Sequence, residues 1–201
     1  VKPSTEQNGH FVLGLAGSKG FQWEIDGAAW DALNKSVKLA TQYDLGATTG
    51  SEDTWWNGDG KTKDNGGWQG STFNKDVSTS GVGTIFADKW THVACSYDAT
   101  AKVGSMYVNG EKVREWDFNL WPDGDAKRSA QGVTYAGNAA PANELAFGFI
   151  QARENVTLTD TWADYSNPDN NHFLGELDDV RIFSAPLTQT EVTLMYNSEK
   201  P

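Results

Sequence analysis

One short stretch, SMYVNGEKV at residues 105–113, constrains the fold more than any other part of the sequence. Asn109 and Gly110 stand between two runs of β-forming residues, and this pair favours a two-residue hairpin turn. The stretch therefore predicts two adjacent antiparallel strands. Comparable apolar or alternating runs, bounded by turn-forming residues, predict further strands at residues 10–16, 21–25, 37–44, 90–98, 144–151 and 173–183.

The sequence predicts one short helix, close to its C-terminal end. Thr188 and Glu191 have the spacing of a capping box, and apolar residues follow them. Pro186, just upstream, favours the end of the preceding strand. The 201 residues contain neither an internal repeat nor a linker between two cores, so we expect one all-β domain, residues 1–201, with antiparallel strands and this helix.

The charge and the hydropathy pattern exclude two classes of partner. The net charge is −11 and the isoelectric point is near 4.6, whereas binding to nucleic acid needs a basic surface. The same charge disfavours an anionic membrane surface. No run of about 18 apolar residues is present, so no membrane span is expected. An acidic chain of this kind is compatible with solubility outside a cell and with calcium.

Motifs of several catalytic classes are missing from the sequence. The three histidines, His10, His92 and His172, share no metal-ligand spacing, and neither a nucleophile elbow nor a phosphate-binding glycine loop is found. Cys95 is the single cysteine, which makes an internal disulfide impossible. Its apolar neighbours predict a buried, unreactive thiol.

Three segments carry a resemblance to a known family: WTHVACSYDATAKVGSMYVNGEKV at residues 90–113, GELDDVRIFSAPLTQTEVTLMY at residues 175–196, and the opening VKPSTEQNG. Together they resemble the laminin-G-like, concanavalin A-like lectin and glucanase superfamily, in its bacterial jelly-roll branch. The resemblance covers about half of the chain. It implies a two-sheet antiparallel jelly-roll sandwich with one concave sheet and one short C-terminal helix.

The same resemblance raises a question about the beginning of the sequence. In this family the segment similar to VKPS ends an interior strand, so the first strands of the fold are expected upstream of Val1. Either those strands are missing or this branch supplies them in another way. If they are missing, one edge of the sandwich is left unpaired.

Glu24 and Asp26 raise the possibility of glycoside hydrolysis. They lie two residues apart in a predicted strand, so their carboxylates should share one face, as in a retaining glycosidase. Glucanases of the resembled family carry a third carboxylate in the pattern E-x-D-x-x-E or E-x-D-x-E. Here the positions that would supply it are Ala28 or Ala29 after the first pair, and Val180 or Arg181 after the second pair, Glu176 and Asp178.

The missing third carboxylate is decisive for the interpretation of these pairs. We therefore interpret Glu24 and Asp26 as a solvated strand face, and we expect no catalytic residue. Hydrolysis by a non-standard carboxylate pair stays a third hypothesis.

Calcium is the cofactor that the resemblance implies. Asp178 matches a position at which family members hold a structural Ca²⁺ on the convex side of the fold. A hard cation needs about six to eight oxygen ligands, so one aspartate is only part of such a site. The alternative, that Asp178 and Asp179 are ordinary strand-edge carboxylates, stays open.

Tryptophans in polar, glycine-rich segments give the strongest indication of function. The flat face of an indole suits the apolar face of a pyranose ring, and nearby carboxylates and amides can bond its hydroxyls. The long irregular segments at residues 45–84 and 119–143 hold such combinations. The predicted carbohydrate-binding residues are Trp55, Trp56, Asp59, Trp68, Gln69 and Trp121. The alternative for each tryptophan is that it folds back to cover the core.

The sequence and the resemblance together predict a non-catalytic, lectin-like carbohydrate-binding module of a secreted or surface bacterial protein. Its partner would be an oligosaccharide or polysaccharide, and it would stand beside other domains of a larger protein at the cell surface or outside the cell. The alternative from another class is a protein-interaction or spacer domain. An exposed apolar patch with buried tryptophans would favour that alternative.

Overall fold

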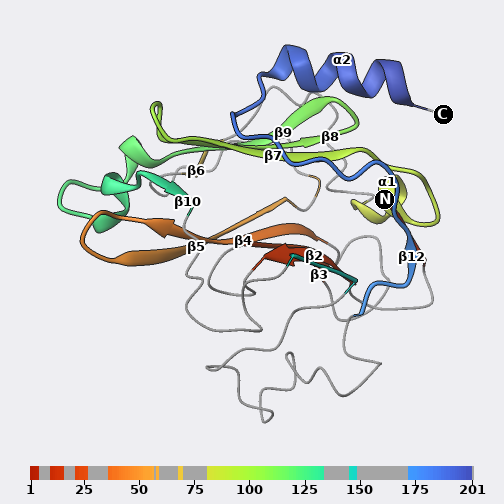
Figure 1. Cartoon of the computed structure of the whole chain (residues 1–201), viewed down its shortest axis with the longest axis horizontal. Helices are drawn as coiled ribbons and strands as arrows, with labels where there is room; N and C mark the ends of the chain where they lie inside the picture. The colour runs from red at the N-terminus through yellow and green to blue at the C-terminus, as the bar shows by residue number, and fades with distance from the viewer. Residues whose placement is uncertain are drawn as a thin grey trace, which may run out of the picture.

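The computed structural model describes residues 1–4, 10–15, 21–26, 36–56, 58, 68–69, 81–133, 145–148 and 172–200. These residues form mostly β-strands in antiparallel sheets, together with a helix near the C-terminal end (Figure 1). The predicted all-β class is therefore confirmed.

The larger sheet has six strands in the order β10-β4-β3-β2-β11, with β5 pairing with β4. Their bounds are β2 (His10–Leu15), β3 (Phe21–Asp26), β4 (Ser36–Asp44), β5 (Thr49–Trp56), β10 (Gly132–Val133) and β11 (Leu145–Phe147). β2 and β3 pair antiparallel, so the first two predicted strands form.

The second sheet has four strands in the order β6-β9-β8-β7, namely β6 (Trp68–Gln69), β7 (Val93–Asp98), β8 (Val103–Val108) and β9 (Glu111–Asp117). The Asn109-Gly110 turn joins β8 to β9, as predicted. Both residues have left-handed backbone, with φ of 50° and 79°, which is the conformation that a two-residue hairpin turn requires.

The predicted strand at residues 173–183 forms only in part, and this part of the prediction is wrong. Within it the structure has β12 (Gly175–Glu176), which pairs with β1 (Lys2–Pro3). Asp179 has left-handed backbone, with φ of 49°, which interrupts a strand directly after β12. Residues 177–187 continue without regular secondary structure toward the helix.

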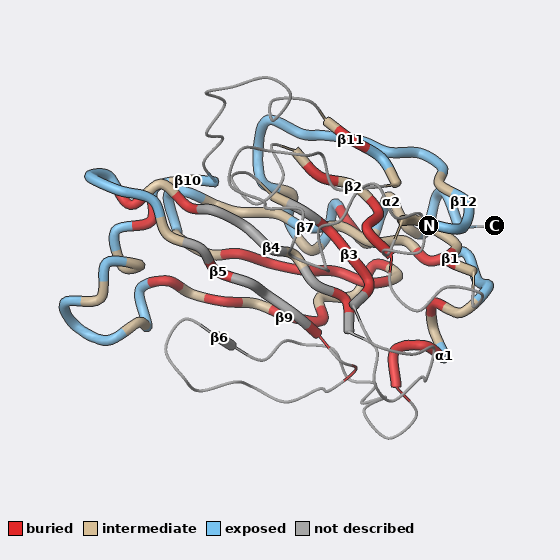
Figure 2. The backbone as a smooth tube through the Cα atoms, turned by 90° about the horizontal axis from the view of Figure 1, so that it is seen from below, coloured by how far each residue is buried: buried red, intermediate tan, exposed pale blue. Residues whose placement is uncertain are grey.

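The hydrophobic core lies between the two larger sheets, which form two layers in Figure 1. The residues between the layers come from both sheets, and Figure 2 shows the buried positions in red along the central strands. Each apolar side chain removed from water contributes about 1.5–3 kcal/mol. The largest contributors to this core are Trp23, Ile25, Trp56, Phe86 and Met106. Phe86 comes from α1 (Gly83–Phe86), a one-turn helix that the sequence reading missed.

A second cluster closes one end of the two layers. It consists of Tyr43, Leu45, Trp116, Phe118 and Ala130. It is bordered by two short 3-10 helices, η3 (Phe118–Leu120) and η4 (Ala126–Ser129). Gly104 is required here because a Cβ at this position would come within 2.2 Å of the Trp116 ring.

Helix α2 (Gln189–Glu199) confirms the predicted capping box. The Thr188 side chain accepts from the Glu191 amide, and the Thr188 amide donates to the Glu191 carboxylate at 2.8 Å. These bonds stabilise the ionised form of Glu191 and lower the pKa of its carboxyl group. The helix lies over the outer side of the four-stranded sheet (Figure 1), with Val192 as its fully buried residue.

Candidate functional site

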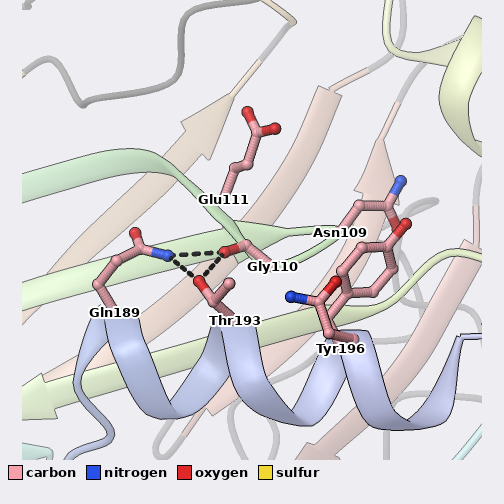
Figure 3. A pocket seen from close by; sticks show the side chains of 7 residues that line it. Asn109, Gly110, Glu111, Gln189, Thr193 and Tyr196 are labelled. Atoms are coloured by element: carbon pink, nitrogen blue, oxygen red, sulfur yellow. Dashed lines mark hydrogen bonds between the residues drawn. The ribbon is translucent and has the colours of Figure 1, made fainter.

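A cleft of about 320 Å³ lies between the β8–β9 turn and α2. It is lined by Asn109, Gly110, Glu111, Gln189, Thr193, Tyr196 and Asn197 (Figure 3). One wall comes from the hairpin and the other from the helix. The lining combines one aromatic ring with three side-chain amides, a hydroxyl and a carboxylate.

Two helix side chains fix α2 to the turn through one carbonyl. The Gly110 carbonyl accepts from Gln189 Nε2 at 2.6 Å and from Thr193 Oγ1 at 2.7 Å (Figure 3). The Gln189 side chain also accepts from the Lys112 amide at 3.0 Å. Because these groups hold the two walls together, the cleft has a defined shape without a ligand.

Tyr196 lies against the turn residue Gly110. A Cβ added to Gly110 would come within 2.9 Å of Tyr196 Cδ1. A glycine is therefore needed at this position both for the positive φ and for the contact with the ring. The Tyr196 ring also faces the His92 ring, with centroids 6.0 Å apart, and the Lys200 ammonium lies 5.7 Å from the Tyr196 centroid.

His92 supports the same turn from below the helix. The His92 amide donates to Asn109 Oδ1 at 3.1 Å, and the Asn109 amide donates to the His92 carbonyl at 2.9 Å. Burial lowers the pKa of the imidazole, while Glu199 opposes this shift. The imidazole is therefore neutral at neutral pH, and it places no charge of its own beside the Tyr196 ring.

The lining of the cleft brings one aromatic ring together with polar side chains. It contains neither cysteine, serine nor histidine. Within the described part of the chain, no group of three or more His, Cys, Asp or Glu residues could hold a metal ion. An aromatic ring surrounded by amides is instead a combination that binds polar organic ligands.

Asp178, the predicted calcium ligand, lies in the exposed segment after β12. Its Oδ1 accepts from the Asp179 amide at 2.9 Å. Among the described residues, no group of three or more His, Cys, Asp or Glu side chains that could hold a metal ion surrounds it. The calcium site therefore stays a prediction.

Two of the predicted carbohydrate-binding tryptophans are described with their side chains. Trp56 has no exposed surface and belongs to the main core. It is therefore a core residue rather than a stacking platform, because its position on β5 directs it between the sheets. Trp121 is half-buried and packs against the second cluster.

Two basic side chains contact Trp121, one at its ring and one at its backbone carbonyl. The Lys127 ammonium lies 4.2 Å from the centroid of the Trp121 ring, a cation–π contact. The Trp121 carbonyl accepts from the Arg128 guanidinium at 2.6 Å. Lys127 is also paired with the buried carboxylate of Glu52.

The remaining predicted carbohydrate-binding residues lie outside the described side chains. The backbone of Trp55 pairs with Lys38 in the β4–β5 register, and that of Trp68 and Gln69 pairs with β9. Asp59 lies outside the described residues altogether. These four assignments stay predictions.

Two interpretations of single side chains are wrong. Glu24 is only 4% exposed, so it is not part of a solvated face; it lies on β3, which has a neighbouring strand on each side. Cys95, expected to be buried, is exposed on the edge strand β7. Neighbouring atoms nevertheless desolvate the thiol and raise its pKa to about 12, so the expectation of a protonated, unreactive thiol agrees with its surroundings.

The sequence reading missed the cleft although it identified both of its walls. The hairpin turn and the capped helix each have a strong local signal, but about 80 residues separate them. No local pattern states that Gln189 and Thr193 meet the Gly110 carbonyl. The one indication in the sequence was that these two polar residues lie one turn apart on the side of the helix that faces the core.

Comparisons with known proteins give little further guidance. No protein-family model matches the chain, and no curated protein matches it. Among the described residues, no helix is long and apolar enough to cross a membrane. One solved structure, an S-layer domain-containing protein (residues 221–444) from Clostridium thermocellum, is similar with a TM-score of 0.31 and 16% identity. The match covers 89% of this chain and 57% of that chain, and its low score supports no argument about fold or function.

Proposed function

We propose that this protein is a non-catalytic carbohydrate-binding module and that the cleft between the β8–β9 turn and α2 is one of its binding sites. The observation that carries the proposal is the lining of this cleft, where the Tyr196 ring stands among the side chains of Asn109, Glu111 and Asn197. Sugars present apolar ring faces and many hydroxyl groups, and they match such a mixture of an aromatic face with polar groups.

The proposal extends to fold and location. Because of the motifs at residues 90–113 and 175–196, we assign the two layers of sheet to the concanavalin A-like jelly-roll class. With the acidic charge, this resemblance favours an extracellular or bacterial cell-surface protein that acts beside other domains. Trp55 and Trp68 remain candidates for a second sugar-contacting surface, and a structural Ca²⁺ at Asp178 remains part of the proposal.

Calorimetric titration with neutral oligosaccharides of glucan, xylan and mannan type tests the function. We expect saturable binding by at least one class. Asn197→Ala should weaken binding about threefold to tenfold, the effect of one lost hydrogen bond. Leu194→Ala is the matched control, because Leu194 lies on the same helix, is 63% exposed and does not line the cleft.

The possible results of this titration test the proposed function and the proposed site separately. If no saccharide binds, the carbohydrate-binding proposal is wrong. If binding is unchanged in Asn197→Ala but lost in Trp55→Ala or Trp68→Ala, the function stands and the site is the one predicted from the sequence. An equal loss of saccharide affinity in Asn197→Ala and Leu194→Ala would indicate a general effect on the helix.

A second candidate function is that of a protein-interaction domain. It is favoured by three exposed apolar side chains close together in the segment before α2, namely Val180, Ile182 and Phe183, with exposed fractions of 44%, 70% and 47%. Exposed apolar groups in succession are typical of protein interfaces. Replacing all three by serine should then abolish binding to the partner without affecting any saccharide binding.

A further inference from the structure

His92, the residue directly before β7, contacts both walls of the cleft. Its amide donates to Asn109 Oδ1 at 3.1 Å, and its carbonyl accepts from the Asn109 amide at 2.9 Å. Its ring lies beside the Tyr196 ring, with the centroids 6.0 Å apart and the planes inclined by 46°. The backbone of His92 therefore supports the β8–β9 turn, while its side chain supports α2.

The surroundings of the imidazole favour its neutral form. Burial lowers the pKa of His92 below its usual 6.5. Nδ1 of this ring is buried and has no hydrogen-bond partner in the described part of the chain. A neutral imidazole can leave that nitrogen unprotonated, whereas an imidazolium carries a proton on both nitrogens. Protonation would thus add a charge and a buried N–H group that has no acceptor.

The charged groups around the imidazole compensate for this cost only in part. Among the described residues, the ionisable groups that face it are Tyr196 and Glu199 of α2, Arg181 of the segment before the helix, and the amino group of Val1. Glu199 favours the imidazolium, whereas Arg181 and the amino group oppose it. Arg181 also donates to Glu199 Oε1 at 2.5 Å, so this carboxylate already has a cationic partner.

The first half of α2 is firmly attached to the sheet. Gln189 and Thr193 donate to the Gly110 carbonyl at 2.6 Å and 2.7 Å (Figure 3). Val192, from the same half, is the fully buried residue of the helix. None of these attachments involves the imidazole, so they can persist when His92 becomes charged.

The second half of α2 depends on contacts close to His92. Tyr196 packs on the turn and on the imidazole, and Asn197 follows it in the lining of the cleft. The ion pair between Arg181 and Glu199 also holds this half, but the two side chains are 43% and 31% exposed, and such pairs contribute little. Moving the Tyr196 ring away would admit the water that an imidazolium needs.

We propose that His92 is a pH-dependent switch for the cleft: the neutral imidazole keeps Tyr196 and Asn197 in place, and the imidazolium displaces them and weakens ligand binding. This inference rests on the proposed function, because it concerns the regulation of the same site. The formed cleft is fully populated above pH 6.5 and is lost as the pH falls through the lowered pKa of His92. By linkage, a ligand that requires the formed cleft lowers this pKa further.

The first test uses the protein without any saccharide. Nuclear magnetic resonance spectra between pH 7.5 and pH 4.5 follow the His92 ring, the amides of Gly110 and Asn197, and the nuclear Overhauser effect between the His92 and Tyr196 rings. We expect the two amides to shift with the midpoint of His92 and the ring-to-ring effect to disappear with it. Far-UV circular dichroism checks that the protein stays folded over this range.

His92→Gln is the matched variant, because it keeps the backbone bonds to Asn109 but carries no titratable group. The shifts of the two amides at the His92 midpoint should be absent from it. A ring-to-ring effect in the wild type that survives protonation of His92 would overturn the proposal, and this result does not depend on the variant being folded. Amide shifts that persist unchanged in a folded His92→Gln protein would also overturn it.

The second test repeats the calorimetric titration of a neutral saccharide at pH 7.5 and pH 5. A neutral saccharide does not titrate in this range, so any change in affinity comes from the protein. We expect binding to be about fivefold or more weaker at pH 5 in the wild type and equal at both pH values in His92→Gln. Equal affinity at both pH values in the wild type would overturn the switch and leave the proposed function standing. If no saccharide binds at either pH, the proposed function is wrong, and the spectra of the free protein decide whether His92 controls the cleft.

Discussion

Trp121 and Tyr196 are two half-buried aromatic residues at different places in the molecule, and their surroundings differ. Trp121 packs against the second cluster, and its ring is covered by the Lys127 ammonium at 4.2 Å. Tyr196 lies on α2 against the turn residue Gly110 and lines a cleft with several amide side chains. The first ring belongs to a closed end of the two layers, and the second lines a cleft.

The difference shows that the type of residue does not determine its role. Trp121 lies in an irregular, polar segment, which favoured a platform for sugars, yet Lys127 and Arg128 hold it in place. Tyr196 follows the predicted helix start, where the sequence predicted no binding residue. The role of an aromatic side chain depends on which side chains cover it, and these come from distant parts of the chain.

The largest expected effect contrasts the two places directly. Trp116→Ala, at the closed end, should lower the free energy of unfolding by about 3–5 kcal/mol, because Trp116 is only 1% exposed. Tyr196→Ala should lower the free energy of unfolding by less than half of that amount. Urea unfolding followed by circular dichroism measures both. An equal loss for the two variants would contradict the distinction between a structural end and an accessible cleft.

Alanine substitution of two glycines measures the contact at the cleft. Gly110 and Gly124 both have positive φ, 79° and 86°, but a Cβ at Gly124 would meet no atom within 4 Å. Gly124→Ala should therefore lower the free energy of unfolding by about 1–2 kcal/mol, which is the cost of a left-handed backbone for a residue with a Cβ. Gly110→Ala should cost about 2–4 kcal/mol, because its Cβ also collides with Tyr196. Similar thermal shifts for the two variants would show that Tyr196 does not press on the turn.

Lys127→Met tests whether the closed end depends on its charge. The substitution keeps an aliphatic chain but removes the ammonium that contacts Trp121 and pairs with Glu52. We expect a loss of about 1–2 kcal/mol in the free energy of unfolding, because the Glu52 side chain is largely buried. Saccharide binding should not change. If the Lys127→Met protein is folded but binds saccharide more weakly, Trp121 contacts the saccharide after all.

The smallest effect concerns acid stability near the cleft. Burial lowers the pKa of His92 below its usual 6.5, so protonation disfavours the folded state. His92 therefore contributes its full stability above pH 6.5, and this contribution is lost as the pH falls through the lowered pKa. His92→Gln should reduce the loss of stability between pH 7.5 and pH 5. If the stability of the variant depends on pH as steeply as that of the wild type, groups other than His92 cause this dependence.

Local sequence signals predicted the elements that depend on neighbouring residues. The Asn109-Gly110 turn and the Thr188–Glu191 capping box both form as expected. In each case the backbone conformation is determined by residues within one turn of each other. The same local signals could not predict that the two elements enclose a cleft.

Predictions that depended on distant partners were less accurate. Residues 173–183 have the composition of a strand, but only β12 finds a pairing partner among the described residues. Trp55 and Trp56 are adjacent and looked equivalent in the sequence, yet Trp56 lies fully in the core. Which of two neighbouring tryptophans faces the core depends on strand register, which is set by pairing with β4.

The most direct test of the carbohydrate-binding proposal is a ¹H–¹⁵N correlation spectrum recorded during titration with the neutral oligosaccharides. The account predicts saturable shifts concentrated at Asn109, Gly110, Tyr196 and Asn197, with little change at Trp121 and Lys127. Saturating concentrations of every oligosaccharide that leave the cleft resonances unmoved would contradict the assignment of this cleft as a sugar-binding site.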